Sequence, residues 1–276
     1  MLGSLLIVFR EVMEAGLIVG IVLAATQGIP QRGRWVAGGI GAGIAGAGIV
    51  AVFAGALSQA LSGNGQDVFS ATILCLAVVM LGWHIVWMAR HGREMARDMK
   101  AVGAEVASGN RSLLAMAVVV AVAVLREGME VVLFLYGIAI SSGTGPVPML
   151  IGGILGVFAG AALSWALYRG LVVIPLNRLF AVTGLLVTFL AAGMASQAAA
   201  LLANDDLLPA LGYDIWDSSW LLSDGSMLGR AAKALVGYSD RPTGIQILAW
   251  IGTCVVLTVT GHLVRHRTPT KAGRAA

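Results

Sequence analysis

Hydrophobic residues gather along the chain into seven runs, each long enough to cross a membrane as a helix. A hydrocarbon core of roughly 30 Å needs about 20 helical residues. The runs cover approximately residues 2 to 25, 35 to 61, 68 to 89, 113 to 140, 147 to 168, 179 to 202 and 243 to 264. The first run has no Lys or Arg before it, and Arg10, Glu11 and Glu14 interrupt it, unlike the apolar region of a signal peptide. We therefore predict seven membrane-spanning helices, the first of them retained.

Composition independently indicates an integral membrane protein. Of the 276 residues, 58% are hydrophobic and only 12% are charged, against roughly 25% charged in a soluble domain. The mean hydropathy is +0.88. The net charge of +4 comes from short basic clusters between apolar runs rather than from one patch, so we expect membrane lipid around the chain and no nucleic-acid partner. Cys75 and Cys254 lie singly within apolar runs and receive no role.

Basic residues fall mainly on one side of the predicted membrane. The segments after the first, third and fifth runs, together with the C-terminal tail, hold 13 of them, whereas the opposite side holds only Arg230, Lys233 and Arg241. Basic loops stay in the cytoplasm. We therefore expect an external N-terminus and a cytoplasmic C-terminus in the cell (inner) membrane, with a cytoplasmic loop at 90–112 and an external segment at 203–242.

Three short motifs recur in the same order in the second half of the chain. The first, "REVMEAGL" at 10–17, returns as "REGMEVVL" at 126–133, an offset of 116. The others are "GGIGAGIAG" at 38–46 with "GGILGVFAG" at 152–160, offset by 114, and "FSATIL" at 69–74 with "FAVTGL" at 180–185, offset by 111. A unit of three helices is odd in number, so its repeat enters the membrane from the other side, as in many secondary transporters.

The predicted fold is thus an all-α integral membrane protein forming a single domain over residues 1–276. It has seven transmembrane helices: two inverted three-helix repeats, at about 1–89 and 113–202, and a seventh helix at about 243–264. Transporters built in this way bind their substrate near the membrane midplane, between the repeats. The glycine-rich stretch at 38–48 indicates close helix packing, because no strand precedes it as a nucleotide loop would require.

The first motif places three charges near the middle of an apolar helix. A single charge there costs roughly 2.5 to 3.5 kcal/mol, so this arrangement needs partners or a function. Glu11 and Glu14 share a helix face, and Arg10 reaches Glu14 one turn away. The second motif repeats the pattern with Arg126, Glu127 and Glu130. If the repeats pack around a pseudo-two-fold axis, four carboxylates and two guanidinium groups meet with a formal charge of −2, which would attract a hard cation.

Other roles for these charges stay open at this point. Arg and Glu could neutralise one another and join two helices, although buried ion pairs seldom stabilise more than apolar replacements. The carboxylates could also relay protons. We expect no enzyme, because the chain has no His-Glu-x-x-His, no Gly-x-Ser-x-Gly and no membrane-embedded Ser with a nearby His.

The two Arg-Glu-x-x-Glu motifs, with "RGRW" at 32–35 and "LVGYSDRP" at 235–242, resemble the oxidase-dependent ferric iron permeases, a family of high-affinity iron transporters that includes bacterial EfeU-type and fungal members. The resemblance implies uptake of ferric iron as a substrate, with no prosthetic group. It also implies a separate external iron oxidase, peroxidase or iron-binding protein as partner. Proton-coupled transport of another hard or divalent cation, such as manganese or lead, is the alternative. By this resemblance the metal ligands are Glu11, Glu14, Glu127 and Glu130, supported by Arg10 and Arg126.

Further polar residues have weaker interpretations. The external segment is acidic, and Asp214, Asp217 and Asp224 could collect cations at the mouth or dock a partner. An interfacial helix anchored by Trp216 and Trp220 explains the segment equally well. His84 and His262 lie near cytoplasmic helix ends and are expected to serve packing or interfacial contact, with a role as an exit ligand for the ion as the alternative. Gln59 and Gln197 are expected to form interhelical hydrogen bonds.

Overall fold

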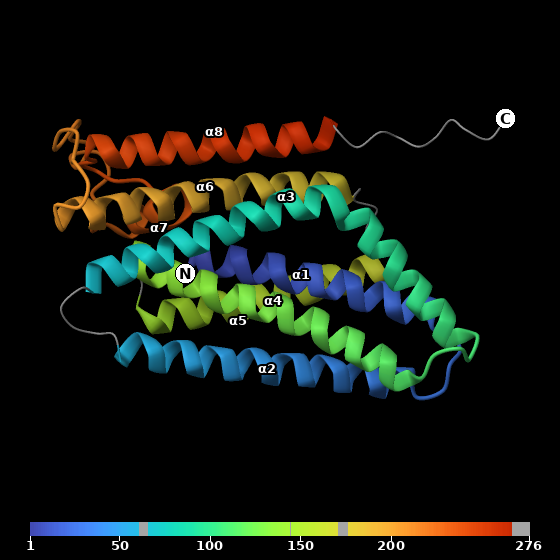
Figure 1. Ribbon diagram of the computed structural model, residues 1–276. Coiled ribbons are helices and arrows are strands. Elements are labelled where there is room, and N and C mark those ends of the chain that lie inside the picture. The colour runs from blue at the N-terminus through green and yellow to red at the C-terminus, as the bar shows by residue number, and fades with distance from the viewer. Residues whose placement is uncertain (61–65, 144, 171–175, 267–276) are drawn as a thin grey trace.

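The computed structural model describes residues 1–60, 66–143, 145–170 and 176–266, and these residues form eight helices and no strand (Figure 1). The helices are α1 (Leu2–Ala25), α2 (Arg32–Ala60), α3 (Gln66–Ala107), α4 (Leu113–Ser142), α5 (Pro146–Tyr168), α6 (Leu176–Asn204), α7 (Met227–Val236) and α8 (Gly244–His266). Among the described residues, α2, α3, α5, α6 and α8 contain stretches long and apolar enough to cross a membrane. This is a multi-pass membrane protein.

The helices α1 and α4 are also long, with 24 and 30 residues, but each carries three charged residues near its middle. Seven of the eight helices start and end within a few residues of the predicted runs, apart from the C-terminal end of α3. The basic tail beyond His266 and Gln59's side chain lie outside what the structure describes.

The predicted loop at 90–112 is wrong, because α3 continues as a helix to Ala107 and only a short turn precedes α4. The apolar run ends near residue 89, but a helix needs only good helix formers, and Ala, Arg, Met, Lys and Glu dominate the following residues. Figure 1 shows α3 bending, so that its second half crosses the end of α1. There Gly103 lies directly against Ala25.

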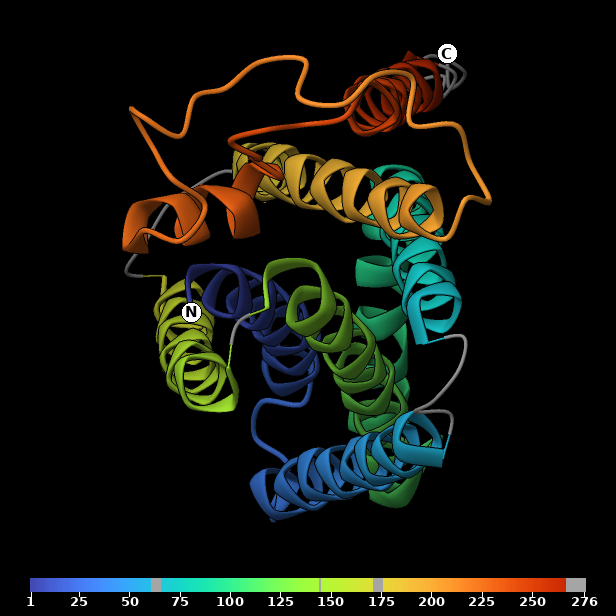
Figure 2. The same ribbon diagram turned by 90° about the vertical axis from the view of Figure 1, so that its left-hand side faces the viewer.

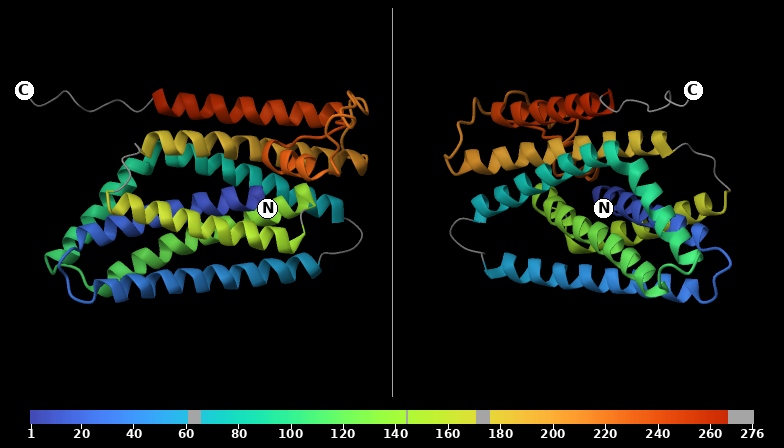
Figure 3. Two further views of the ribbon diagram at one scale, coloured as in Figure 1. Left: turned by 180° about the vertical axis from the view of Figure 1, so that it is seen from behind. Right: turned by 45° about the vertical axis from the view of Figure 1, so that its right-hand side comes forward.

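The two helices that carry the motifs lie at the centre of the bundle. Figure 2 shows them between α2 at one edge and α8 at the other, and Figure 3 shows the same order from two further sides. The helix α1 packs mainly against α5, and α4 packs mainly against α2, while α3 pairs with α6. Each motif-bearing helix therefore has its most extensive contact with a helix from the other half of the chain.

Small residues allow these crossed pairs to approach closely. In α5, Gly152, Gly156 and Gly160 recur every fourth residue and face α1. In α2, Gly39 and Gly43 face α4 in the same way. These glycines face backbone carbonyl groups of the partner helix: those of Met1, Leu5 and Phe9 in α1, and those of Ala117 and Ala121 in α4.

These contacts correct the alignment of the glycine motifs by one residue. Met1 and Leu5 correspond to Ala117 and Ala121 at the offset of 116 found for the charged motifs. The glycines that touch them, Gly152 and Gly156, then correspond to Gly39 and Gly43, an offset of 113 rather than 114. Letter matches in a Gly-rich stretch do not determine register, whereas the face that touches the partner helix does.

Two separate apolar clusters form the core. The first joins the N-terminal half of α3 to α6 and the C-terminal half of α4, with Leu81 and Phe134 fully buried. The second joins the C-terminal ends of α1 and α3 to the N-terminal ends of α2 and α4, with Val22 and Val120 at its centre. Along α1, α3 and α4, the buried charged residues and His84 lie between the buried residues of the two clusters.

The segment between α6 and α8 is mostly irregular. Its one helix is α7. Ser226 caps its start, where the hydroxyl accepts a hydrogen bond from Gly229 N at 2.9 Å, and Gly237 caps its end with a left-handed φ of 69°. Gly237 lies against Gly193 of α6. The indole of Trp250 donates to the Val236 carbonyl at 2.6 Å. The two tryptophans expected to anchor an interfacial helix precede α7, so they do not belong to it.

Candidate metal centre

The three charges of the first motif form one buried ion network on α1. Arg10 is 4% exposed, and its Nη1 lies 3.1 Å from Glu11 Oε1. Its Nε lies 2.9 Å from Oε1 of Glu14, one turn further along the helix. The spacing of the motif predicts this i,i+4 contact, and the structure confirms it.

The second motif repeats the contact on α4 in a more open setting. Arg126 Nε lies 3.3 Å from Glu130 Oε1, but the Arg126 side chain is 33% exposed. Its guanidinium stacks over the ring of Trp87, 4.3 Å from the ring centroid. A cavity of about 290 Å³ between α1, α3 and α4 reaches Arg126 and Glu127. The two motifs are therefore equivalent in sequence but not in surroundings.

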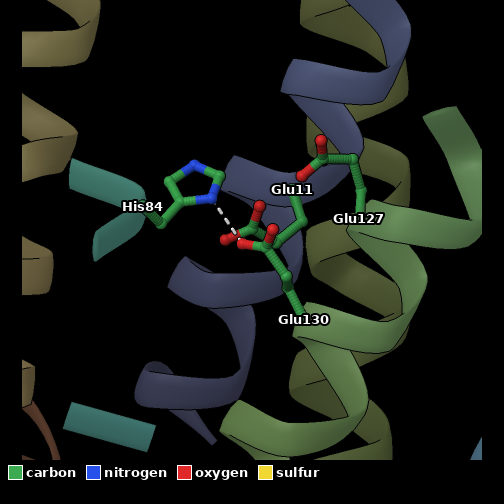
Figure 4. A group of neighbouring side chains, drawn as sticks. All are labelled: Glu11, His84, Glu127 and Glu130. Atoms are coloured by element: carbon green, nitrogen blue, oxygen red, sulfur yellow. Dashed lines mark ion pairs between the residues drawn. The ribbon is translucent and has the colours of Figure 1, made fainter. Parts of the chain in front are cut away.

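Four side chains from three helices converge between the two apolar clusters. Glu11 of α1, His84 of α3, and Glu127 and Glu130 of α4 each offer one ligand atom, and these atoms all lie within 4.8 Å of one another. Figure 4 shows His84 reaching in from one side and the two α4 glutamates from the other, with Glu11 beside them. All four residues are buried. We call this group, together with Glu14, the charged cluster.

His84 corrects the sequence interpretation, which placed it near a helix end in a packing or interfacial role. Because α3 runs from Gln66 to Ala107, His84 lies near the middle of the helix and is 1% exposed. Its Nε2 lies 3.0 Å from Glu14 Oε2, and its Nδ1 lies beside Glu130 Oε2. The apolar run ends near residue 89 and therefore places His84 close to a helix end. The full length of α3 places it near the middle of the helix, where a buried contact is expected.

The charged cluster is short of hydrogen bonds. Among the described residues, five buried side-chain atoms lack a partner with hydrogen-bond geometry: Glu11 Oε2, Glu14 Oε1, His84 Nδ1, Glu127 Oε2 and Glu130 Oε2. Three of them have ion-pair contacts only, Glu14 Oε1 with Arg10 and His84 Nδ1 with Glu130 Oε2. Leaving a buried polar atom unsatisfied costs about 1 to 3 kcal/mol. With neutral His84, four carboxylates and two guanidinium groups carry a formal charge of −2. A cation placed among these atoms would satisfy both the hydrogen-bonding deficit and the charge.

The aspartates expected at the mouth lie apart from this cluster, in the irregular segment. Asp217 pairs with Arg241 at 3.0 Å, and hydrogen bonds from the Ser219 hydroxyl and N–H, with the nearby Arg241, lower the pKa of Asp217. Asp224 pairs with Lys233, also at 3.0 Å. Asp214 is exposed, at a left-handed φ of 48°.

Two other residues considered from the sequence also lie elsewhere. His262 lies in α8 and is not one of the four converging side chains, and Gln197 is half-buried in α6. Their predicted packing and hydrogen-bonding roles stay predictions.

Comparison with known proteins gives a consistent picture. The Iron permease FTR1 family matches residues 1–264. The "Ferrous iron permease EfeU" of Shigella sonnei (strain Ss046) is 30% identical over 276 residues, covering 98% of this chain and 97% of the relative, and the same holds for that of Escherichia coli O157:H7. The EfeU of Yersinia pestis is 30% identical over 247 residues, covering 88% of this chain and 86% of the relative. No solved structure matches the chain significantly.

Proposed function

Because this chain belongs to the Iron permease FTR1 family, we propose that it carries iron across the cell membrane through the charged cluster. The observation that supports this is the convergence of Glu11, Glu127 and Glu130 with His84 at one buried point, next to Glu14. Arg10 and Arg126 support the carboxylates by offsetting part of their mutual repulsion. Iron is the substrate, and no resident prosthetic group is part of the proposal.

The charge of the cluster bears on the oxidation state of the iron. The sequence resemblance implies ferric iron, whereas the relatives are named for ferrous iron. A divalent ion brings the formal charge of −2 to zero, while a trivalent ion leaves a net charge of +1 in a region of low dielectric constant. We therefore propose that iron occupies the cluster in the ferrous state, and ferric iron is the competing possibility.

The proposed architecture is two inverted repeats, α1–α3 and α4–α6, with α8 as the seventh spanning helix. The matching glycine contacts of α2 with α4 and of α5 with α1 support this arrangement. From the distribution of Lys and Arg, we place the N-terminus outside and the C-terminus in the cytoplasm of the inner membrane. The segment at 203–242 is then external, where a separate iron oxidase, peroxidase or iron-binding protein would deliver the ion.

Uptake by proteoliposomes tests the function directly. Radioactive iron is offered as Fe²⁺ under a reductant or as Fe³⁺ citrate, with and without a pH gradient, and with Mn²⁺ or Pb²⁺ as competitor. The test variants are Glu11→Gln and Glu127→Gln, which keep the side-chain size but remove a charge. Glu105→Gln is the matched control, because Glu105 lies on the exposed end of α3, paired with Arg111.

We expect wild type and Glu105→Gln to take up Fe²⁺ equally, and both cluster variants to lose most uptake at normal protein levels. Uptake of Fe³⁺ alone would retain the transporter but reverse the proposed oxidation state. Wild-type uptake by both cluster variants would show that the charges only join helices. Faster transport of Mn²⁺ or Pb²⁺ than of either iron ion would assign a different cargo.

A further inference from the structure

We infer that His84 is a direct ligand of the transported ion and that Glu14 positions this imidazole rather than binding the ion itself. The inference rests on the proposed function and makes it more specific. It divides the five residues of the charged cluster into a contact set, Glu11, His84, Glu127 and Glu130, and one supporting carboxylate.

The first argument comes from the two nitrogens of His84. Both face carboxylate oxygens, Nε2 at 3.0 Å from Glu14 Oε2 and Nδ1 beside Glu130 Oε2. A neutral imidazole carries one N–H, so it can donate to only one of these oxygens. The contact with Glu14 has hydrogen-bond geometry, whereas Nδ1 has no hydrogen-bond partner. With the proton on Nε2, the Nδ1 lone pair faces an anionic oxygen of Glu130. A cation bound by both of these atoms would remove their repulsion.

The second argument concerns Glu14. Its carboxylate lies between Arg10 and His84, with Arg10 Nε 2.9 Å from one oxygen and His84 Nε2 3.0 Å from the other. Histidines that bind metals usually donate their second N–H to such a carboxylate, which sets the tautomer and the ring orientation. The ligand atoms that come within 4.8 Å of one another belong to the other four residues and not to Glu14. Glu14 is therefore a positioning residue.

The contact set differs from an all-carboxylate site in its metal preference. Three carboxylates alone suit Mg²⁺, Ca²⁺ and Mn²⁺, whereas an added imidazole nitrogen favours later first-row metals such as Fe²⁺ and Co²⁺. His84 is thus the residue that biases the site toward iron. The two motifs contribute unequally, because the second gives two contact residues and the first gives one contact residue and one support.

Metal binding by the purified full-length protein tests this without relying on transport. Mn²⁺ bound to wild type is examined by pulsed electron paramagnetic resonance for coupling to an imidazole nitrogen, in protein grown with ordinary or ¹⁵N-labelled histidine. Competition between Co²⁺ and Mn²⁺ then gives the metal preference. The variants are His84→Gln, Glu14→Gln, the double variant, and His262→Gln as a histidine control in α8.

We expect the nitrogen coupling in wild type, its change to a ¹⁵N pattern on labelling, and its loss in His84→Gln but not in His262→Gln. The preference for Co²⁺ over Mn²⁺ should fall about tenfold or more in His84→Gln. Glu14→Gln should retain the coupling and weaken Co²⁺ binding roughly 10- to 100-fold. The double variant should bind no more weakly than His84→Gln, because both changes disable the same ligand.

Absence of histidine coupling in the labelled wild type would overturn the inference, even if no variant could be purified. Additive losses in the double variant would also overturn it, because Glu14 would then bind the ion independently. Failure of the proposed function has a different signature: Glu11→Gln and Glu127→Gln would bind Co²⁺ as wild type does. If those variants lose Co²⁺ while His84→Gln keeps the wild-type preference, only the present inference fails.

Discussion

Arg10 and Arg126 hold the same position in the two motifs but have different surroundings. Arg10 is almost completely buried between two carboxylates. Arg126 is one-third exposed, lies over Trp87 and borders a cavity. Both arginines border a cavity, but only Arg126 is substantially exposed, so its surroundings compensate more for the loss of the guanidinium than those of Arg10 do.

Arg10→Gln should therefore destabilise the protein more than Arg126→Gln. Removing one member of a fully buried ion network costs about 3 to 5 kcal/mol, because the remaining charges lose their compensation. We expect Arg10→Gln to lower the yield and the thermal transition in detergent strongly, and Arg126→Gln to lower them much less. Fluorescence-detected size-exclusion chromatography after heating measures both, and equal losses would contradict the asymmetry.

The residues of the charged cluster could be predicted from the sequence only in part. Helical spacing predicts the contacts of Arg10 with Glu14 and of Arg126 with Glu130, because these contacts are local. His84 comes from a different helix, 70 residues from its partner Glu14. Such a long-range contact depends on how α1 and α3 pack. That packing is set by small residues and close contacts that a single sequence does not display.

At the scale of elements, the glycines of α2 divide between two faces. Gly39 and Gly43 touch α4, so that a Cβ added at Gly43 would lie 2.8 Å from the Ala121 carbonyl oxygen. Gly41 and Gly48, by contrast, have nothing within 4 Å of the position of an added Cβ. The sequence predicts close packing for the whole stretch, whereas only one of its faces provides it.

Gly43→Val and its counterpart Gly156→Val should both destabilise the protein, while Gly48→Val should not. A Cβ at residue 156 would lie 2.7 Å from the Leu5 carbonyl oxygen, so the backbones must separate. Overpacking of this kind costs about 1 to 3 kcal/mol or more. Thermal unfolding of the three variants provides the measurement, and a loss in Gly48→Val as large as in the other two would show that composition rather than contact matters.

The hydrophobic runs predicted seven of the helices well, because membrane-spanning length and apolar composition leave few alternatives. They failed at the second half of α3 and at α7. The second half of α3 is polar, and its helical state depends on propensity and on contacts such as that between Gly103 and Ala25. The short α7 is held by tertiary contacts with Gly193 and Trp250, which lie in other helices.

The segment at 203–242, which we propose to be external, yields a prediction about ion collection. Asp217 and Asp224 already pair with Arg241 and Lys233, so any attraction of cations would depend more on Asp214. Asp214→Asn should raise the half-saturating iron concentration modestly at low ionic strength and not at high salt, because exposed charges act through screened attraction. Uptake kinetics at two salt concentrations provide the measurement, with Asp217→Asn as comparison. No change at low salt would leave the segment an interfacial role only.

At the scale of the whole molecule, the charged cluster is enclosed by apolar side chains along the three helices that form it. Leu81 and Phe134 belong to the apolar cluster on one side of it, and Val22 and Val120 belong to the apolar cluster on the other side. The cavity of about 290 Å³ reaches Glu127 from the side of Val22 and Val120, whereas an ion that leaves toward Leu81 and Phe134 must pass that apolar cluster. If the ion passes through the charged cluster as proposed, the apolar cluster around Leu81 and Phe134 must separate during transport, as in alternating access between two repeats.

The proposed orientation can be tested with single cysteines. Cys75 and Cys254 are first replaced by serine. Ser223→Cys and Ser108→Cys then each place a single thiol on an exposed turn, and the proposed topology puts these two turns on opposite sides of the membrane. The cells keep an intact inner membrane, and their outer membrane is made permeable so that a thiol reagent unable to cross the inner membrane can reach its outer face. This reagent should label residue 223 but not residue 108. The reverse pattern would invert the topology and, with it, the direction of transport.

The exchange of partners between the two halves also affects how the chain is made. The helix α1 ends at Ala25, but its main partner α5 begins only at Pro146, about 120 residues later. At a synthesis rate of roughly 5 to 20 residues per second, this delay is about 6 to 24 s. Until then α1 carries Arg10, Glu11 and Glu14 without its main partner helix, and His84 follows Ala25 only after 59 residues, about half of that delay. We therefore expect the first helix to stay with the insertion machinery until the second half of the chain is made.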